Sequence, residues 1–404
     1  MVDITTHASG RYGAQVITWR SGVVMSVDRA WRGAQELTVQ FDGEGDSVRA
    51  LAYPELVGKP VVGDRVLVNT SALDRELGTG GYALVIALPE RLPADPLPTP
   101  GHLVKARYTP MQTLVLGVDE QDSEHHRVLA EADDLLDMPV VVADLHSALP
   151  AIIAGARHAA QRAGIAPPRV AYVMTDGGAL PAWFSRNVSG LRAAGWLETC
   201  VTVGQAFGGD LEAATVHTGL LAARHVSAAD IAVVAQGPGN LGTGTRWGFS
   251  GVAAGEAINA VAALRGRPVA ALRISGADKR SRHHGVSHHS LTAYGRVALA
   301  RADVVVPDLA GSTDPDLVAL GVKVDLQVTG LGGRSCGHRL VRIPVTDLYD
   351  ALEASPVALS TMGRGLPDDP AAFLASAAAG AHAAALYREA RGPARLPSRA
   401  RDDH

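Results

Sequence analysis

The chain has 404 residues, of which 47% are hydrophobic and only 4% aromatic, and its formal net charge is −4. This composition supplies enough apolar residues for a large core and excludes a disordered chain, a coiled coil and a disulfide scaffold. The near balance of 37 basic and 41 acidic residues argues against a protein that binds nucleic acid nonspecifically.

The sequence also predicts a cytoplasmic location. Residues 1–12 lack the apolar region of a signal peptide, and no apolar run reaches the roughly 18 residues of a membrane-spanning helix. The two cysteines, Cys200 and Cys336, do not require a disulfide, so a reduced chain is the simpler interpretation. We therefore expect no association with a membrane.

Residues 13–90 are predicted to form a small β-barrel domain. Five apolar or alternating runs are separated by turn residues, and none of them has a helical period. The runs are Gly22–Asp28, Gln35–Phe41, Ser47–Tyr53, Asp64–Asn69 and Tyr82–Leu88. A closed barrel of the SH3-like or OB type would leave no open sheet edge. Because the strands lack interleaved arginine and aromatic residues, docking is favoured over oligonucleotide binding.

A different pattern begins after a proline-rich segment at 91–110, which is predicted to be a linker. Through 111–391, short aliphatic runs alternate with amphipathic segments, which predicts a doubly wound α/β domain with a mostly parallel sheet. The expected strands are Thr113–Val118, Pro139–Ala143, Val170–Met174, Cys200–Val203, Ile231–Ala235, Val269–Ile274, Asp303–Val306 and, less regularly, 326–329 and 340–344. The expected helices are 147–163, 182–194, 210–225, 250–265, 287–300 and 370–388. Residues 392–404 are predicted to be a flexible tail.

Unusual polar residues follow five of the expected strands. Because ligands of open parallel sheets bind at the carboxyl ends of the strands, these residues predict a polar pocket along one edge. The candidate acid–base groups at that edge are Asp144, His146, Asp176, His288 and His289. Gly208, Gly209 and Asp210 are candidate ligand contacts, although Asp210 also fits the N-cap of the next helix.

A glycine-rich segment follows the strand that ends near Ala235. Its G-x-G-x-x-G pattern lacks the immediate helix and the acidic residue of a dinucleotide fingerprint, so a small anion is favoured over NAD or FAD. The candidate ligand-binding residues are Gly237, Gly239, Asn240, Gly242, Thr243, Thr245 and Arg246. We expect an anion against the backbone N–H groups of 239–245. The alternative is a loop that only turns tightly.

Four histidines lie within seven positions at 283–289. Such density is typical of metal ligation, proton transfer or anion binding, and Ser287 is expected to cap a following helix. His284 and His288 are four residues apart, and together with Asp144, His146 and Asp176 they offer nitrogen and oxygen ligands that suit zinc or another divalent ion. The alternative is that the histidines act as acid–base groups without metal, so the cofactor stays open.

Several long motifs resemble a known family. They include ALAYPELVG, GDRVLVNT, VVADLHSALP, VMTDGGALPAWFS, VGQAFGGDLEAATVHTGL, AQGPGNLGTGTRWGFSG and GVSHHSLTAYGRVAL. Over residues 15–310 the chain is similar to uncharacterised bacterial proteins that are catalogued as a domain of unknown function. The resemblance implies a bacterial, cytosolic protein, and it implies no activity, fold or cofactor.

Three functions fit these observations. The first is an enzyme, a hydrolase or group transferase, that acts on a small anionic metabolite; the second is a noncatalytic metabolite sensor; the third is a structural partner in a complex. The sequence contains no G-x-S-x-G, Walker A or C-x-x-C motif, which disfavours serine-hydrolase, P-loop and thioredoxin-like chemistry. The alanine-rich helices predict self-association into a homo-oligomer.

Overall fold

A computed structural model describes residues 17–43, 45, 47–78, 80–332 and 337–391. The chain divides into two compact units, Met1–Leu97 and Pro98–His404. The expected tail at 392–404 and Cys336 lie outside the described residues. No helix in the described part of the chain is long and apolar enough to cross a membrane.

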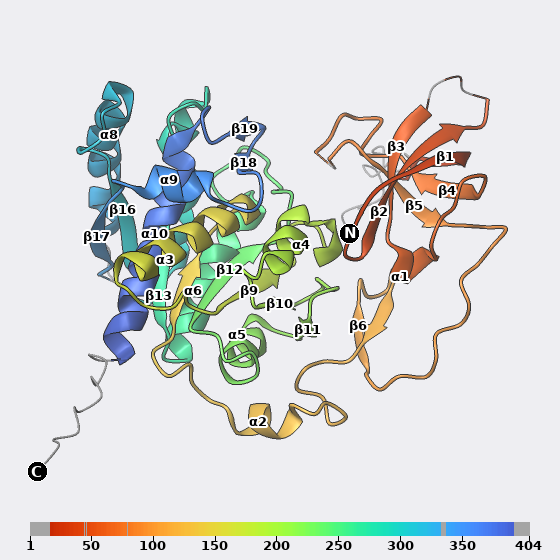
Figure 1. Cartoon of the computed structure of the whole chain (residues 1–404), viewed down its shortest axis with the longest axis horizontal. Coiled ribbons are helices and arrows are strands. Elements are labelled where there is room, and N and C mark those ends of the chain that lie inside the picture. Colours follow the sequence, from red (N-terminus) through yellow and green to blue (C-terminus); the bar gives the residue numbers. More distant parts are fainter. Residues whose placement is uncertain (1–16, 44, 46, 79, 333–336, 392–404) are drawn as a thin grey trace, which may run out of the picture. The chain divides into compact units, whose positions relative to one another are not determined.

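The first unit contains a closed five-stranded barrel, as the sequence predicts (Figure 1). Its elements are β1 (Trp19–Trp31), β2 (Ala34–Phe41), β3 (Ser47–Ala52), α1 (Pro54–Val57), β4 (Arg65–Asn69) and β5 (Ala83–Ala87). The long β1 pairs with both β2 and β4, while β3 and β5 run parallel, and these pairings close the sheet. Gly22 allows β1 to lie against β2, because a Cβ atom there would be 2.4 Å from the Gln40 carbonyl oxygen.

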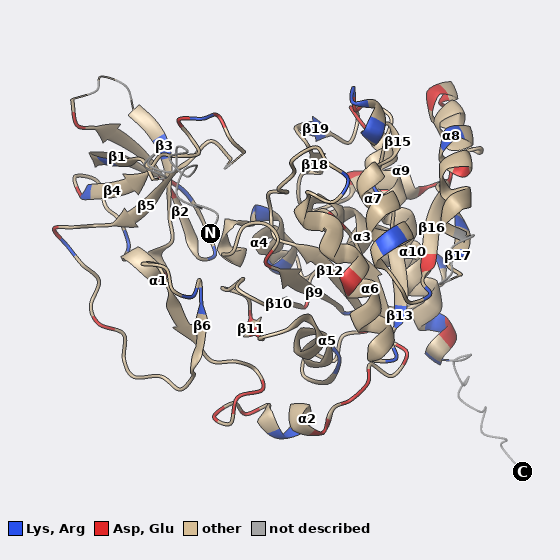
Figure 2. Ribbon diagram, turned by 180° about the vertical axis from the view of Figure 1, so that it is seen from behind, with Lys and Arg blue, Asp and Glu red and all other residues tan. Residues whose placement is uncertain are grey.

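The second unit contains an eight-stranded parallel sheet in the order β11-β10-β9-β12-β8-β13-β16-β17. The strands are β8 (Pro139–Val142), β9 (Val170–Thr175), β10 (Thr199–Thr202), β11 (Leu211–Glu212), β12 (Ile231–Gln236), β13 (Arg267–Ala271), β16 (Asp303–Asp308) and β17 (Arg339–Pro344). The central strands are aliphatic and buried, and the charged residues lie mainly in the surrounding loops and helices (Figure 2). This pattern is typical of a parallel sheet covered on both faces.

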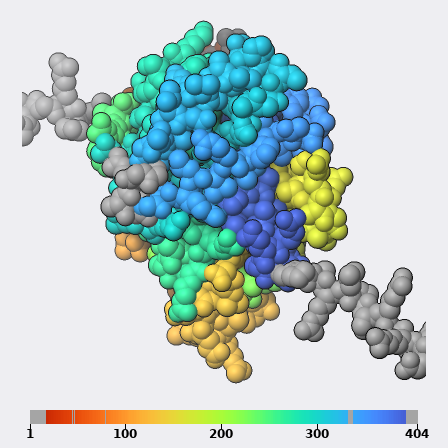
Figure 3. Space-filling view, turned by 90° about the vertical axis from the view of Figure 1, so that its left-hand side faces the viewer, coloured from red at the N-terminus to blue at the C-terminus, as the bar shows by residue number. Residues whose placement is uncertain are grey.

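Helices cover the two faces of this sheet. The helical elements are α2 (His126–Glu131), η1 (His146–Ala148), α3 (Leu149–Arg162), η2 (Ala182–Phe184), α4 (Arg186–Ala193), α5 (Val216–His225), η3 (Ser250–Val252), α6 (Ala253–Ala263), η4 (Ser281–His283), α7 (His288–Thr292), the π-helical η5 (Ala293–Val297), α8 (Pro315–Gly332), α9 (Leu348–Glu353) and α10 (Pro370–Arg391). One face carries α3, α9 and α10, which pack on one another, and the other carries α5, α6 and η5 (Figures 1 and 2). The C-terminal segments form most of the surface seen in Figure 3.

Short two-stranded sheets complete the second unit. They are β6 (Leu103–Lys105) with β7 (Thr113–Val115), β14 (Ile274–Ser275) with β15 (Gly285–Val286), and β18 (Ser360–Thr361) with β19 (Arg364–Gly365). Two strand predictions were wrong. The run Thr113–Val118 is not a strand of the parallel sheet: β7 pairs antiparallel with β6, and Gly117 makes an isolated parallel bridge to Glu212 of β11. The run at 326–329 lies inside α8. The segment 91–110, predicted to be a linker, contains β6 and the boundary between the two units.

The contact between α3 and α10 depends on two glycines. A Cβ atom on Gly155 would lie 1.9 Å from the Ala377 carbonyl oxygen, and one on Gly380 would lie 1.8 Å from the Ile152 carbonyl oxygen. Both distances are far below van der Waals contact, so a side chain at either glycine would force the two helices apart.

We expect Gly155→Ala to lower the free energy of unfolding by about 1–3 kcal/mol, the usual cost of overpacking a tight core. Gly330→Ala in α8 is the matched control, because no heavy atom lies within 4 Å of the new Cβ. It should gain up to about 1 kcal/mol from its higher helix propensity. Urea unfolding of both variants checks this, and equal effects would contradict the close packing.

Candidate functional site

The candidate site lies where two neighbouring strands send the chain to opposite faces of the sheet. From β8 the chain continues to α3, and from β13 it continues through the β14–β15 hairpin to α7 and η5. Asp144 follows β8, and Arg273 follows β13. In open α/β sheets such a divergence creates a crevice at the carboxyl edge. The fold therefore brings these two side chains together at that crevice.

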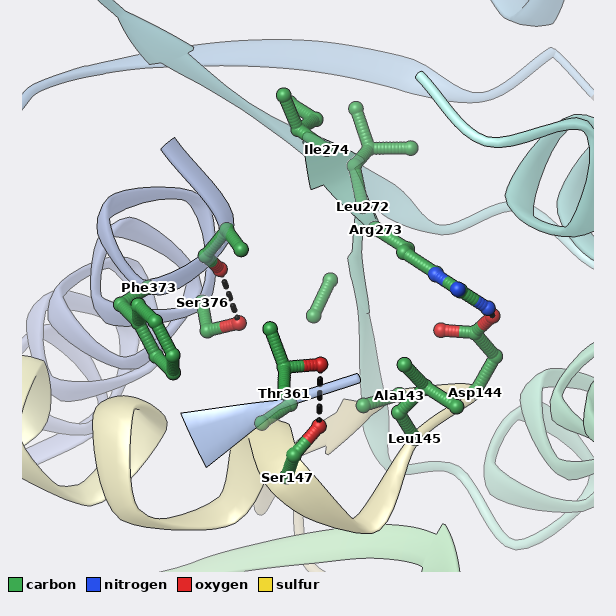
Figure 4. A pocket seen from close by; sticks show the side chains of 13 residues that line it. Ala143, Asp144, Leu145, Ser147, Leu272, Arg273, Ile274, Thr361, Phe373 and Ser376 are labelled. Carbon is green, nitrogen blue, oxygen red and sulfur yellow. Dashed lines mark hydrogen bonds and ion pairs between the residues drawn. The ribbon is translucent and has the colours of Figure 1, made fainter. Parts of the chain in front are cut away.

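Asp144 and Arg273 form a buried ion pair (Figure 4). The Asp144 side chain is 3% exposed, and its Oδ2 atom lies 3.9 Å from Arg273 Nη1 and 3.9 Å from His289 Nδ1. Arg273 Nη1 donates to His289 Nδ1 at 3.3 Å. No described residue donates a hydrogen bond to Asp144 Oδ2. Burial raises the pKa of Asp144, and the Arg273 charge opposes this rise.

The backbone that follows β8 is held from the next strand. Gln236, the last residue of β12, donates its Nε2 protons to the Asp144 carbonyl and to Asn240 Oδ1, both at 2.9 Å. Asp144 borders two cavities of about 30 and about 10 Å³. Spaces of this size hold one or two water molecules. Both spaces that Asp144 lines are therefore of the size of water molecules.

Three histidines gather beside this ion pair. The ligating nitrogens of His283, His288 and His289 all lie within 4.8 Å of one another. Ser287 organises the group, because its Oγ accepts from the His289 N–H at 3.2 Å and lies 2.8 Å from His283 Nδ1. His283 and His289 are buried, and His288 Nε2 is also buried and has no partner among the described residues.

The surroundings of this cluster favour the neutral form of its imidazoles. Burial is the main cause, and the Arg273 charge adds to it for His283 and His289, which lowers their pKa values to about 4 and about 3. The pKa of His288 is lowered as well, by burial first and then by Arg282. Phe249 stacks on the His289 ring at 3.8 Å between centroids, which fixes the ring plane.

The predicted pairing of His284 with His288 was wrong. His284 Nδ1 lies 2.9 Å from Lys323 Nζ on α8, and His284 is not in the cluster. Gly285, with a φ of +80°, follows His284 and begins β15, the second strand of the β14–β15 hairpin. The side chains before and after it therefore face different surroundings. His283, which we did not predict, takes the place of His284.

The glycine-rich loop 237–248 lies beside the cluster and is largely exposed. A Cβ atom on Gly244 would be 4.0 Å from Arg282, next to His283. Thr243 N–H is used internally, since it donates to the Gly248 carbonyl at 2.7 Å. The loop therefore borders the histidines. In the described part of the chain, these backbone N–H groups make no hydrogen bond: Gly239, Asn240, Gly242, Gly244 and Thr245.

Two of the predicted acid–base residues lie apart from the histidine cluster. His146 is buried in η1, and its ring nitrogens lie 3.0 Å from the Tyr172 hydroxyl and 2.8 Å from Ser185 Oγ. Asp176 is exposed after β9, and its Oδ2 accepts from the Gln205 N–H at 2.8 Å. Both ring nitrogens of His146 therefore have hydrogen-bond partners within the fold, which is typical of a histidine with a structural role.

The segment 208–210 is also used within the fold. Gly208 N–H donates to Glu212 Oε1, Gly209 N–H donates to Thr202 Oγ1, and Asp210 Oδ2 accepts from Cys200 N–H. The predicted N-cap role of Asp210 was wrong, because β11 follows it and Thr215 caps α5. These residues stabilise the β10–β11 edge of the sheet.

Three contributors to the site were not predicted as such. Arg273, Gln236 and His283 each follow or end a short element, where the sequence pattern gives no direction for the side chain. A signal was present for Arg273, since an arginine inside the apolar run VAALRI requires a buried partner. The acid after the parallel strand next to it, Asp144, is that partner.

The pKa of His146 predicts a pH dependence of stability. Burial lowers it from 6.5 to about 4. Between pH 4 and pH 6.5 the unfolded chain therefore binds one more proton at this residue than the folded chain does. The contribution of the neutral His146 ring to the free energy of unfolding is complete above pH 6.5 and is lost as the pH falls towards 4. We expect His146→Gln to reduce the slope of unfolding free energy against pH by about 1.4 kcal/mol per unit in that window. Urea unfolding at several pH values measures it, and an unchanged slope would contradict the buried neutral ring.

A larger hollow of about 470 Å³ lies elsewhere in the second unit. It is lined by polar residues that include His284, Lys323, Asp314 and Asp368, and by none of the three clustered histidines. The lining combines the positive charge of Lys323 with the negative charges of Asp314 and Asp368, so the hollow has mixed charge. It is a second place where a small molecule would fit.

Comparison with known proteins gives a family without an assigned activity. A family model described as "Protein of unknown function (DUF3866)" matches residues 49–380, which include β4, β5 and most of β3 of the barrel and all of the candidate site. No curated protein matches the chain. The match extends past the end of the resemblance seen in the sequence at residue 310.

Proposed function

Because this chain belongs to the family of proteins of unknown function DUF3866, we propose its function from the site alone: an enzyme, a hydrolase or group transferase, that acts on a small anionic metabolite. The observation that carries the proposal is the position of His289, which lies 3.9 Å from the buried Asp144 carboxylate and stacks on Phe249, the residue that follows the largely exposed loop 237–248. Active sites of open α/β sheets usually lie in the crevice at the carboxyl edge, and a cluster of titratable side chains there is a candidate for one.

The proposed roles follow from the geometry. The free N–H groups of the loop 237–248 and the nearby Arg282 bind the anionic group of the substrate. His288 and His289 contact the reacting centre as acid–base groups or metal ligands. Asp144 is a positioning residue in this proposal, because it pairs with Arg273, which donates to His289 Nδ1, and the two spaces that it lines are small. We also propose a cytoplasmic, self-associating protein.

A second candidate is a noncatalytic sensor, which the hollow beside His284 and Lys323 favours. Mass spectrometry of a metabolite extract, before and after incubation with the purified full-length chain, separates the two. An enzyme depletes a phosphorylated or carboxylated metabolite and forms a product in proportion to time. Retention of a metabolite by the protein with no product over many equivalents would contradict the enzyme and support the sensor.

A further inference from the structure

The histidine cluster has the composition of a metal site. We propose that His283, His288 and His289 bind one transition-metal ion, with zinc as the expected occupant. Three imidazoles with a fourth position open to water are a ligand set of catalytic zinc sites. The proposal rests on the proposed function, because it supplies the group that would polarise water or substrate at the same crevice.

The distances suit this assignment. Zinc–nitrogen bonds of about 2.0–2.1 Å in a tetrahedral site place the nitrogens roughly 3.3 Å apart. The three nitrogens already lie within 4.8 Å of one another, so small rotations of the rings bring them into range. The unpartnered His288 Nε2 atom is buried, and a ligand would remove the cost of leaving it without a hydrogen bond.

The surrounding residues provide the outer contacts that a metal-bound histidine requires. Such histidines usually donate the proton of their second nitrogen to an oxygen. His283 Nδ1 faces Ser287 Oγ at 2.8 Å. His289 Nδ1 now accepts from Arg273, but a metal on its Nε2 would place the proton on Nδ1. Asp144 Oδ2, at 3.9 Å and free of hydrogen bonds, is the acceptor for that proton.

The charges around the cluster bear on whether it can hold a metal ion. Of the nearby cations, Arg280 is neutralised by Asp278 through two hydrogen bonds, and Arg273 is paired with Asp144.

The test is a titration of the untagged, full-length, metal-free protein with Zn²⁺, and with Co²⁺ as a spectroscopic probe. We expect one equivalent to bind, with the visible absorption of a four-coordinate cobalt site. His288→Asn, His289→Asn and His283→Asn should each weaken zinc binding about 100-fold or more, and Asp144→Asn about 10-fold. His284→Asn is the matched control and should bind as the wild type does.

Two results would overturn the metal site. One is less than about a tenth of an equivalent of zinc bound by the wild-type chain after zinc is added. The other is a loss of affinity in His284→Asn that equals the loss in His288→Asn. If His283→Asn or His289→Asn does not fold, the zinc titrations of the wild-type chain and of His288→Asn, which changes a half-buried residue, decide the question.

The metal site and the enzyme can fail separately. One equivalent of zinc at the three histidines, without turnover of any anionic metabolite, supports the metal site and contradicts the enzyme. Turnover that persists in protein that binds no zinc, and that a chelator does not change, contradicts the metal site and supports the enzyme.

Discussion

Replacing Lys105 by methionine is expected to lower the free energy of unfolding by about 3–5 kcal/mol, the cost of leaving a buried charge without its partner. The Lys105 side chain is fully buried at the end of β6. Its Nζ donates to the carbonyls of Ala206 and Ala213 at 3.0 and 2.9 Å and lies 3.6 Å from Glu212 Oε2. The change would remove the cation beside the Glu212 carboxylate, whose remaining donors include Gly208 N–H and Thr202 Oγ1. It would also remove the Lys105 donor from the carbonyl oxygens of Ala206 and Ala213.

The double variant Lys105→Met with Glu212→Gln should recover part of this loss, because it also removes the stranded charge. Arg162→Met is the matched control, since its ion pair with Asp347 at 2.8 Å is exposed and should change stability by less than about 1 kcal/mol. Urea unfolding measures all three variants. A loss below about 1 kcal/mol for Lys105→Met would show that the pair is not closed to water.

Asp144→Asn should lower the catalytic rate strongly, although it changes the shape of the side chain very little. The substitution keeps the shape of the side chain but removes the charge that pairs with Arg273, the residue that donates to His289 Nδ1. We expect kcat for the anionic substrate to fall about 100-fold with little change in KM, because Asp144 does not contact the bound molecule. Steady-state kinetics measures this split, and Asp144→Glu should restore part of kcat.

A rise in KM with kcat unchanged would contradict this role of Asp144, because it would place the carboxylate in substrate binding. Circular dichroism of Asp144→Asn provides the structural control. His158→Ala on α3 is the kinetic control: this histidine is half-buried, away from the cluster, and its replacement should leave both constants unchanged.

The sheet could be predicted because its central strands are short, aliphatic and separated by helices. Runs such as Val170–Met174 are too short for a buried helix and are bounded by turn residues, which favours a strand buried on both faces. The run at 326–329 is ambiguous by itself, since its β-branched residues also fit a helix. In α8, Thr329 Oγ1 donates to the Leu326 carbonyl at 2.8 Å, and tertiary packing determines the outcome.

The site could be predicted only in part. The edge of the sheet follows from strand direction, which placed Asp144, His288 and His289 in one region. The exchange of His284 for His283 could not be predicted, because the directions of the two side chains depend on η4 and on the start of β15 at Gly285, which lie in the connection of the β14–β15 hairpin. The position of Arg273 beside Asp144 depends on the pairing of β13 with β8, two strands that lie far apart in the sequence.

The most direct test of the proposed site is a titration of the ¹⁵N-histidine-labelled protein with inorganic phosphate, followed by NMR. Spectra of His288→Asn, His289→Asn and His284→Asn assign the relevant rings. If the crevice beside the loop 237–248 binds the anionic group, the signals of His288 and His289 shift together and saturate, and that of His284 does not. A shift confined to His284, or no shift at any ring, would contradict a substrate site at the crevice.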